Sequence, residues 1–358
     1  MQVNIYDWDK TFDENVAAGP NPEYKSDQIQ SDTKDLSFDL FGYRVGSRFG
    51  SAACPAGTDL RYMEKLLVAG FDIVTTKTRR SSFVKANPMP NLLAVEPKEF
   101  SYESNQSILP VFHQIEHITN TRSISLVNSF GNNSLDPSSW LSNDTKLHQQ
   151  LRPDQLVITS IVGTLKPDST IQSYYEDFAK TASLAKSTGT RAIEINFSCP
   201  NVAHEGILCY DKEAVFSVCK LVREVIGQTP LVAKFGYFNA RQYELLRSIV
   251  SSIAPYINGI SAINTIPVEV EPLHEANSLY GGLSGFPIKQ YGLAMVRRLA
   301  AIRDELRANY VIFGIGGVLQ PSDYQEYRNS GADVVLAASG ALYNPNLARE
   351  IKETLQSN

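Results

Sequence analysis

Several short apolar runs of this sequence end in polar side chains of the types that bind ligands. The run at 71–76 is followed by Lys77, and the run at 230–235 carries Lys234. Asparagine stands at the end of three further runs, as Asn128, Asn196 and Asn264, the last followed by Thr265. Burying an unpaired lysine is costly, so Lys234 should face an anion or a polar cofactor. If the runs are strands of one sheet, we expect these side chains to surround one ligand.

The carboxamides indicate what that ligand presents. An asparagine offers a donor and an acceptor in one plane, which matches the alternating N–H and C=O edge of a pyrimidine or flavin ring. Two lysines indicate that negative charge is held, either on the ligand or on a reduced cofactor. A single asparagine at a strand end is also a common turn former, so the prediction depends on the whole set.

A second group of residues is rich in glycine. Gly281-Gly282-Leu283-Ser284-Gly285 precedes a predicted helix, Gly314-Ile315-Gly316-Gly317 ends an apolar run, and Ser339-Gly340-Ala341 follows the last run. Glycine lets the backbone approach a phosphate closely, and α/β barrels bind phosphate in the loops after strands seven and eight. The alternative is that these glycines only turn the chain. The spacing differs from that of a dinucleotide-binding fingerprint.

The elements that must position these residues alternate regularly. Short apolar runs lie at 49–54, 71–76, 155–162, 191–197, 230–235, 257–264, 310–316 and 332–338. Stretches of helical periodicity lie at 59–69, 138–151, 171–187, 211–226, 240–253, 288–307, 321–329 and 345–356. Eight strand–helix units predict a closed (β/α)8 TIM barrel rather than an open doubly wound sheet.

Three connections, at 78–135, 198–210 and 265–287, are too long for plain turns. Each follows the carboxyl end of a predicted strand, where barrel active sites are built. The segments 91–97 and 123–129 predict extra strands across the barrel mouth, and alternation around Gly42 predicts a hairpin before the barrel. We expect a 1–36 extension, which is either a surface wrap or partly disordered, and one barrel domain over 37–358.

Composition excludes several classes of protein. The chain has 358 residues, 43% hydrophobic and 20% charged, with a formal charge of −5, which argues against bulk binding of nucleic acid or anionic membrane. No stretch approaches the ~20 apolar residues of a membrane helix. The polar, acidic N-terminus resembles neither a secretory signal nor a transit peptide. Four cysteines fit reduced thiols, and no metal site is expected. These features predict a cytoplasmic protein.

One motif carries a family resemblance. Asn196-Phe197-Ser198-Cys199-Pro200-Asn201 resembles the N-[LF]-S-C-P-N signature of class 1 dihydroorotate dehydrogenases, and Cys209-Tyr210-Asp211 looks like the soluble class 1A branch. The similarity runs from about 37 to 356. It implies an FMN-dependent oxidoreductase that converts dihydroorotate to orotate in pyrimidine biosynthesis. It also implies a homodimer and fumarate as the electron acceptor.

The resemblance assigns roles to individual residues. Cys199 would be the base that removes the C5 proton while hydride leaves C6 for flavin N5, and Lys77 would reach both flavin and substrate. The expected substrate-binding residues are Lys77, Asn128, Asn196, Asn201, Asn264 and Thr265. The expected FMN-binding residues are Ala52, Ala53, Lys77, Asn196, Lys234, Gly282, Gly316, Gly317, Ser339 and Gly340.

The sequence also departs from the family pattern. Where the soluble family usually has Pro-Gly after Asn201-Val202, this chain has Ala203-His204-Glu205-Gly206 in the expected lid. Phe130 replaces a smaller or more flexible residue, and an insert at about 98–122 is expected to serve oligomerisation or to cover the barrel mouth. The chain's other cysteines are not spaced for an iron–sulfur cluster, so this chain would not carry electrons through a cluster of its own. The sequence does not decide whether a separate electron-transfer subunit exists.

Three other functions stay open. The first is oxidation of another dihydropyrimidine such as dihydrouracil, against which Asn201 argues because that branch usually has histidine there. The second is a non-catalytic FMN-binding relative, against which the intact set of Lys77, Cys199 and Lys234 argues. The third is a phosphate-binding isomerase or aldolase barrel without flavin.

Overall fold

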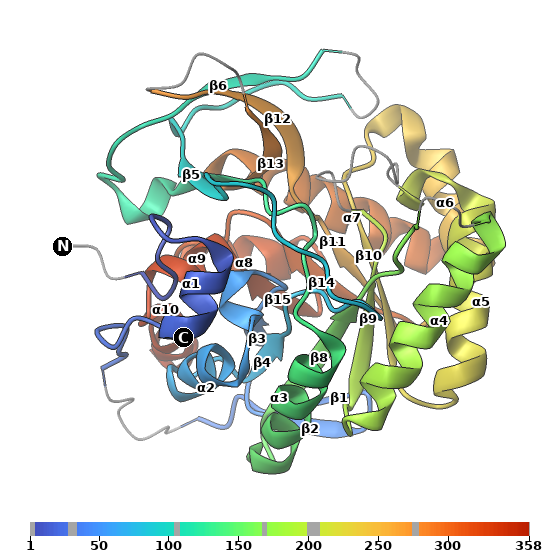
Figure 1. Ribbon diagram of the computed structural model, residues 1–358. Helices are drawn as coiled ribbons and strands as arrows, with labels where there is room; N and C mark the ends of the chain where they lie inside the picture. The colour runs from blue at the N-terminus through green and yellow to red at the C-terminus, as the bar shows by residue number, and fades with distance from the viewer. Residues whose placement is uncertain are drawn as a thin grey trace.

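Eight parallel strands form a closed barrel at the centre of the computed structural model, which describes residues 4–27, 34–103, 108–166, 170–198, 208–273 and 279–357 (Figure 1). In chain order they are β3 (Phe49–Ser51), β4 (Ile73–Thr75), β8 (Leu156–Ile161), β9 (Ala192–Asn196), β10 (Leu231–Phe235), β11 (Gly259–Ala262), β14 (Val311–Ile315) and β15 (Val334–Ala337). The pairing of β15 with β3 closes the ring. Every predicted apolar run contains one of these strands, and the (β/α)8 barrel is confirmed.

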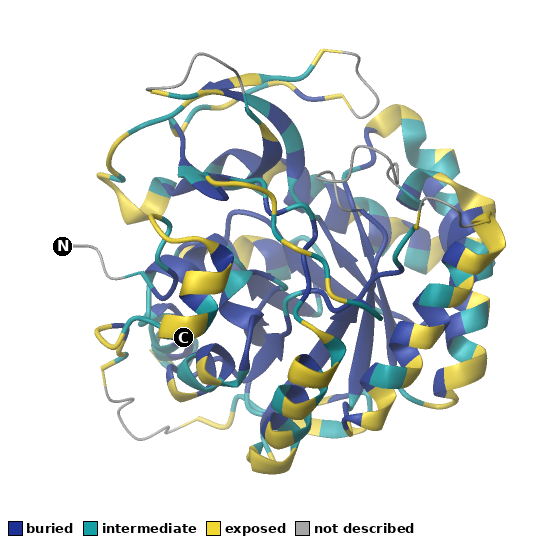
Figure 2. Cartoon of the chain, viewed as in Figure 1, coloured by how far each residue is buried: buried dark blue, intermediate teal, exposed yellow. Residues whose placement is uncertain are grey.

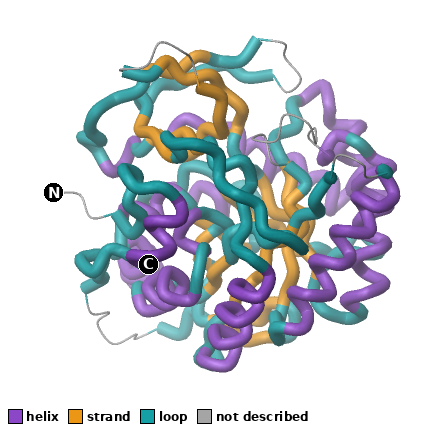
Figure 3. The backbone as a smooth tube through the Cα atoms, viewed as in Figure 1, coloured by secondary structure: helices purple, strands orange, loops and turns teal. Residues whose placement is uncertain are grey.

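Helices surround the strands (Figure 3). They are α2 (Leu60–Val68), α3 (Pro137–Gln150), α4 (Ile171–Ser187), α5 (Lys212–Ile226), α6 (Tyr243–Ile253), α7 (Lys289–Leu306), α8 (Pro321–Asn329), α9 (Ser339–Tyr343) and α10 (Leu347–Ser357). Single 3-10 turns are η1 (Pro55–Gly57), η2 (Thr121–Ser123), η3 (Leu208–Tyr210), η4 (Ala240–Gln242) and η5 (Phe286–Ile288). Asp59, Thr170 and Asp211 accept hydrogen bonds from backbone N–H groups of the first turns of α2, α4 and α5, which sets where these helices begin.

Two apolar cores result from the alternation of side chains along the strands. One fills the barrel and includes Ile73, Leu156 and Phe313, and the other lies between the strands and the helices. Figure 2 shows buried strands inside a ring of helices whose outer faces are exposed. The predicted hairpin, β1 (Phe38–Leu40) and β2 (Tyr43–Val45), packs Leu40 and Val45 against the core inside the barrel. Its turn holds Phe41 and Gly42 at positive φ, so Gly42 stands where expected.

A second sheet lies beside the carboxyl ends of the barrel strands. Its order is β5 (Leu92–Ala94), β7 (Ser125–Asn128), β13 (Leu279–Gly285), β12 (Ile266–Glu271) and β6 (Val111–His113). We call it the mouth sheet. The two extra strands predicted at 91–97 and 123–129 are confirmed as β5 and β7, and the 98–122 insert supplies β6.

The glycine-rich stretch 281–285 differs from the two other glycine-rich groups. It is not a loop, because it forms part of β13 and pairs antiparallel with β12 and β7. The reason is that glycine permits close approach of neighbouring strands as readily as it permits a turn. A β-carbon on Gly281 would lie 2.6 Å from the Asn128 carbonyl oxygen, so the strands pack together only without it.

The N-terminal segment 4–27 wraps over the barrel, and sequence analysis missed its helix. That helix is α1 (Phe12–Ala18), which begins in a capping box between Thr11 and Glu14. The Ile5 N–H donates to the Leu342 carbonyl over 3.0 Å, and the Tyr24 hydroxyl donates to the Ala341 carbonyl over 2.5 Å. The described part of the extension is therefore docked on the barrel, which agrees with the expectation of a surface wrap.

None of the helices within the described ranges combines the length and apolar character needed to cross a membrane.

A buried ion pair holds the start of the long connection after β4. Arg79 Nη2 lies 2.7 Å and Arg79 Nε 3.2 Å from the two carboxylate oxygens of Asp144 on α3, and the two side chains are 2% and 0% exposed. Arg79 Nη1 also donates to the Thr58 carbonyl, so one guanidinium joins three segments around β4.

We expect Asp144→Ala to lower the free energy of unfolding by about 3–5 kcal/mol, because it leaves the buried Arg79 charge unpaired. Urea denaturation measures this loss. Asp136→Ala is the matched control on the same helix, since it removes an exposed N-cap and should cost about 1 kcal/mol. Equal losses in the two variants would contradict the assignment.

Candidate active site

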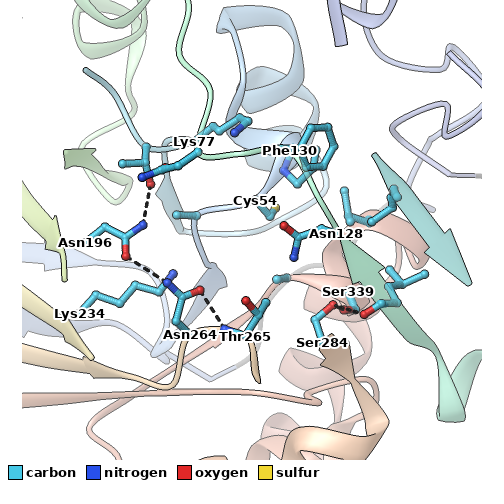
Figure 4. Close-up of a pocket in the computed structure, with 18 residues that line it drawn as sticks. Cys54, Lys77, Asn128, Phe130, Asn196, Lys234, Asn264, Thr265, Ser284 and Ser339 are labelled. Atoms are coloured by element: carbon cyan, nitrogen blue, oxygen red, sulfur yellow. Dashed lines mark hydrogen bonds between the residues drawn. The ribbon is translucent and has the colours of Figure 1, made fainter. Parts of the chain in front are cut away.

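A cavity opens where the barrel strands end (Figure 4). Eight residues predicted from the sequence line it: Ala53, Lys77, Asn128, Asn196, Lys234, Asn264, Thr265 and Ser339. Residues not predicted complete the lining: Cys54, Pro55, Thr78, Leu92, Leu126, Phe130, Asn132, Ser284, Ala338 and Leu342. The structure thus brings together side chains from six barrel strands and from the mouth sheet, as expected for this face of a barrel.

Lys234 is the most constrained residue of the cavity. It lies on β10, where it pairs in register with Asn196 of β9 and Ser261 of β11, and it is 4% exposed. Within the described ranges no hydrogen bond or ion pair reaches its ammonium group. A buried ammonium without a protein acceptor carries a large desolvation cost. The position therefore fits a ligand that supplies negative charge or polar oxygens.

Two asparagines orient each other beside Lys234. Asn264 Nδ2 donates to Asn196 Oδ1 over 3.0 Å and also to the Ser198 carbonyl. Asn196 Nδ2 in turn donates to Thr78 Oγ1 over 3.3 Å, and Asn264 Oδ1 accepts the Thr265 N–H over 2.9 Å. These bonds fix the planes of both amides, and Figure 4 shows as dashed lines those that join Asn196, Asn264, Thr265 and Thr78. The cavity therefore holds donors and acceptors that are already oriented, as a planar heterocycle requires.

Lys77 reaches the cavity from the end of β4. Its backbone N–H donates to the Gly57 carbonyl over 2.8 Å, and its Nζ donates to the Asn133 carbonyl over 3.4 Å. No aspartate or glutamate stands among the described residues that line the cavity. Among the described lining residues the two lysines therefore contribute positive charge that no lining carboxylate offsets, which suits an anionic ligand.

The mouth sheet closes the opposite side of the cavity. Asn128 Nδ2 donates to the Gly282 carbonyl over 3.0 Å, in register with that residue on β13. A β-carbon on Gly282 would lie 2.2 Å from Thr265 Oγ1, so only glycine lets β13 pack against Thr265 here. Gly282 therefore borders the cavity through its backbone, although it does not line it.

The predicted phosphate loops follow β14 and β15. Gly316 and Gly317 have φ of 127° and 66°, in the region that favours glycine, and both are buried. Neither N–H donates to any acceptor within the described ranges. Ser339 begins α9 and its hydroxyl lies 3.0 Å from the Ser284 hydroxyl. A β-carbon on Gly340 would lie 2.4 Å from the Val318 carbonyl oxygen, so the two loops pack directly together. Buried, unpaired N–H groups of this kind fit an anion.

Several predicted residues are not part of the cavity wall. Ala52, one residue before Ala53 in the sequence, packs in the apolar core inside the barrel. Gly282, Gly316, Gly317 and Gly340 lie next to the wall without lining it. Cys199, Asn201 and the expected lid at 203–206 lie outside the described residues.

Some lining residues had a signal in the sequence and others had none. Cys54 directly follows Ala53 at the end of the first run, and Thr78 directly follows Lys77, so both could have been inferred from their neighbours. Leu92 and Asn132 come from the long connection after β4. No periodicity in that connection says which of its side chains turn toward the barrel.

A family model described as dihydroorotate dehydrogenase matches residues 117–358. A dihydroorotate dehydrogenase of Dictyostelium discoideum is 29% identical over 360 residues, covering 96% of this chain and 95% of the relative. The catalytic subunit of dihydroorotate dehydrogenase B (NAD(+)) from Geotalea uraniireducens is 28% identical over 191 residues, which span 53% of this chain and 60% of that subunit.

The structural comparison concerns the fold. A crystal structure of DHODH in complex with ferulenol from Eimeria tenella superposes with a TM-score of 0.71 at 16% identity, covering 96% of this chain and 88% of that one. The likeness supports the barrel, and the sequence matches confirm the family resemblance drawn from the Asn196–Asn201 motif.

The environment of Cys54 makes a chemical prediction. Burial raises the pKa of the Cys54 thiol to about 11, and the nearby charges of Lys234 and Lys77 offset only part of that rise. The thiolate fraction at pH 8 should therefore be far below that of an exposed cysteine, with reactivity increasing as the pH approaches 11. Alkylation by iodoacetamide, followed by peptide mass spectrometry, measures it. Buried Cys209, with a pKa of about 12, is the internal control. Rapid modification of Cys54 at pH 8 would refute this.

Proposed function

Because this chain belongs to the dihydroorotate dehydrogenase family, we propose that its cavity binds dihydroorotate beside FMN and that the protein oxidises dihydroorotate to orotate in pyrimidine biosynthesis. Membership of the family makes the chain an FMN-dependent oxidoreductase, in agreement with the predicted enzyme class and cofactor. The observation that carries the proposal is Lys234, a buried ammonium with no acceptor within the described residues.

The residues around the cavity fit FMN. Lys234 and Asn196 would hold the polar edge of its ring, and the backbone N–H groups of Gly316, Gly317, Ser339 and Gly340 would hold its phosphate. Ala53 and Gly282 would leave room for close approach, and Lys77 would contact both cofactor and substrate. When bound, FMN supplies the acceptor for the hydride that leaves C6 of the substrate.

The remaining polar groups would hold dihydroorotate. Asn128, Asn196, Asn201, Asn264 and Thr265 would bind the N–H and C=O groups of the ring. Lys77 would pair with the substrate carboxylate and orient it. The hydrogen bonds among Asn196, Asn264 and Thr265 support this assignment, because amides held in place lose little entropy when a ligand binds.

Cys199 is the proposed base that takes the C5 proton. Support comes from the residue before it, since the buried Ser198 carbonyl accepts a hydrogen bond from Asn264 in the cavity wall. A thiol with an ordinary pKa of about 8.5 is mostly protonated at neutral pH. Turnover should therefore rise with pH as the thiolate forms.

Four finer statements belong to the same proposal. Fumarate is the proposed final acceptor, on the class 1A resemblance of Cys209-Tyr210-Asp211. A homodimer and a cytoplasmic location rest on the resemblance and on the composition. The 1–36 extension and the 37–358 domain are the proposed division of the chain. Oxidation of another dihydropyrimidine is the second candidate, and it would use the same cavity and cofactor.

The proposal is tested by the visible spectrum of the purified protein under anaerobic conditions, before and after dihydroorotate is added. We expect flavin absorbance that bleaches at once and returns when fumarate is added. Flavin that bleaches only with dihydrouracil would favour the second candidate, and flavin that no dihydropyrimidine bleaches would reject both.

The variant Lys234→Ala should either lose bound FMN or lose the ability to have its FMN reduced. Full FMN occupancy with normal reduction by substrate would contradict the role given to Lys234.

Cys199→Ala tests the base. The variant should keep its FMN and lose turnover at neutral pH by about 10²–10⁴-fold, because only the proton-transfer group is removed. Steady-state rates against pH measure this, with flavin content as the control for folding. Turnover equal to that of the unchanged protein would exclude Cys199 as the base.

A further inference from the structure

Two aromatic rings flank the ammonium group of Lys77. Lys77 Nζ lies 5.2 Å from the ring centroid of Phe130, which follows β7, and 5.7 Å from that of Phe12 on α1. Both distances are within the ~6 Å range of cation–π attraction. Phe130 lines the cavity, as Figure 4 shows, whereas Phe12 comes from the N-terminal segment 4–27.

Phe12 is held firmly in this position. It is 3% exposed, and its ring meets that of Phe130 edge to face with centroids 6.4 Å apart. Arg61 of α2 donates to the carbonyls of Val16 and Ala17 at the end of α1. The Tyr62 hydroxyl donates to the Asn15 carbonyl over 3.2 Å. The helix that carries Phe12 is thus tied to the barrel.

We propose that segment 4–27 is part of the active site and that Phe12 is a positioning residue, which together with Phe130 holds the Lys77 ammonium at the cavity. The two rings attract the charge and restrict the lysine's rotamers, and they exclude water from its side away from the cavity. The consequence for dihydroorotate binding rests on the proposed role of Lys77 toward the substrate carboxylate.

A purely structural role for Phe12 makes a different prediction. If the ring served only as apolar filling, methionine, an apolar residue of similar size, would replace it, and removal of another buried aromatic residue from the segment would affect Lys77 equally. If the ring face acts on the ammonium, tyrosine preserves the effect and methionine does not. Tyr24, which is buried in the same segment and donates to Ala341, offers the matched control variant Tyr24→Leu.

The first experiment measures acetylation of Lys77 by a small acyl donor, using peptide mass spectrometry on the substrate-free protein. We expect Lys77 to react about three- to tenfold faster in Phe12→Met, as loss of one cation–π contact implies. Phe12→Tyr and Tyr24→Leu should match the unchanged protein. Lys98, whose Nζ lies 4.8 Å from the Phe112 ring centroid, is an internal reference lysine that no variant alters.

The second measurement is the affinity for orotate, read from the flavin spectrum at unchanged FMN content. Phe12→Met should weaken orotate binding by a similar factor. An unchanged Lys77 acetylation rate in Phe12→Met, or an equal rise in Tyr24→Leu, would overturn the inference. If Lys77 responds as expected while the unchanged protein fails to bind orotate, the positioning role stands and the proposed function fails.

Discussion

Burial of positive charge without a protein carboxylate is the constraint on which this site depends. Four cationic side chains are deeply buried near the barrel, and three of them have partners in the chain: Arg79 pairs with Asp144, Lys352 lies 2.8 Å from Asp72, and Arg80 donates to the carbonyls of Asn132 and Gly163. Lys234 has none within the described ranges, although it is buried to a similar degree. The first two pairs cancel their charge within the fold, whereas the charge of Lys234 is left for a ligand.

The rest of the molecule surrounds that charge with groups of complementary shape. The barrel strands deliver Lys77, Asn196 and Asn264 to one end, because parallel strands all finish on the same side. The mouth sheet, which the connections after β4 and β11 build, covers the cavity from the other side. Glycine at position 282 lets that sheet approach Thr265 closely beside the cavity.

The N-terminal segment extends this enclosure beyond the barrel itself. The family model begins at residue 117, whereas Ala53, Lys77 and the docked helix α1 precede it. This earlier part of the chain supplies both a lysine that lines the cavity and the aromatic ring of Phe12 packed against that lysine. The N-terminal extension is polar and lacks apolar periodicity in sequence, yet its buried residue Phe12 packs against Lys77 of the site.

The sequence by itself determined the order and identity of the barrel elements, because alternating short apolar runs and amphipathic stretches are local patterns. It also determined that Lys77, Lys234 and three asparagines meet, since each lies at or near the carboxyl end of a predicted strand. Tertiary structure alone decided the strand at 281–285, the docking of Phe12, and which residues of the long connection face the cavity. Those outcomes depend on partners far away in the chain, such as Asn128 for β13 and Arg61 for α1, and no local pattern encodes a distant partner.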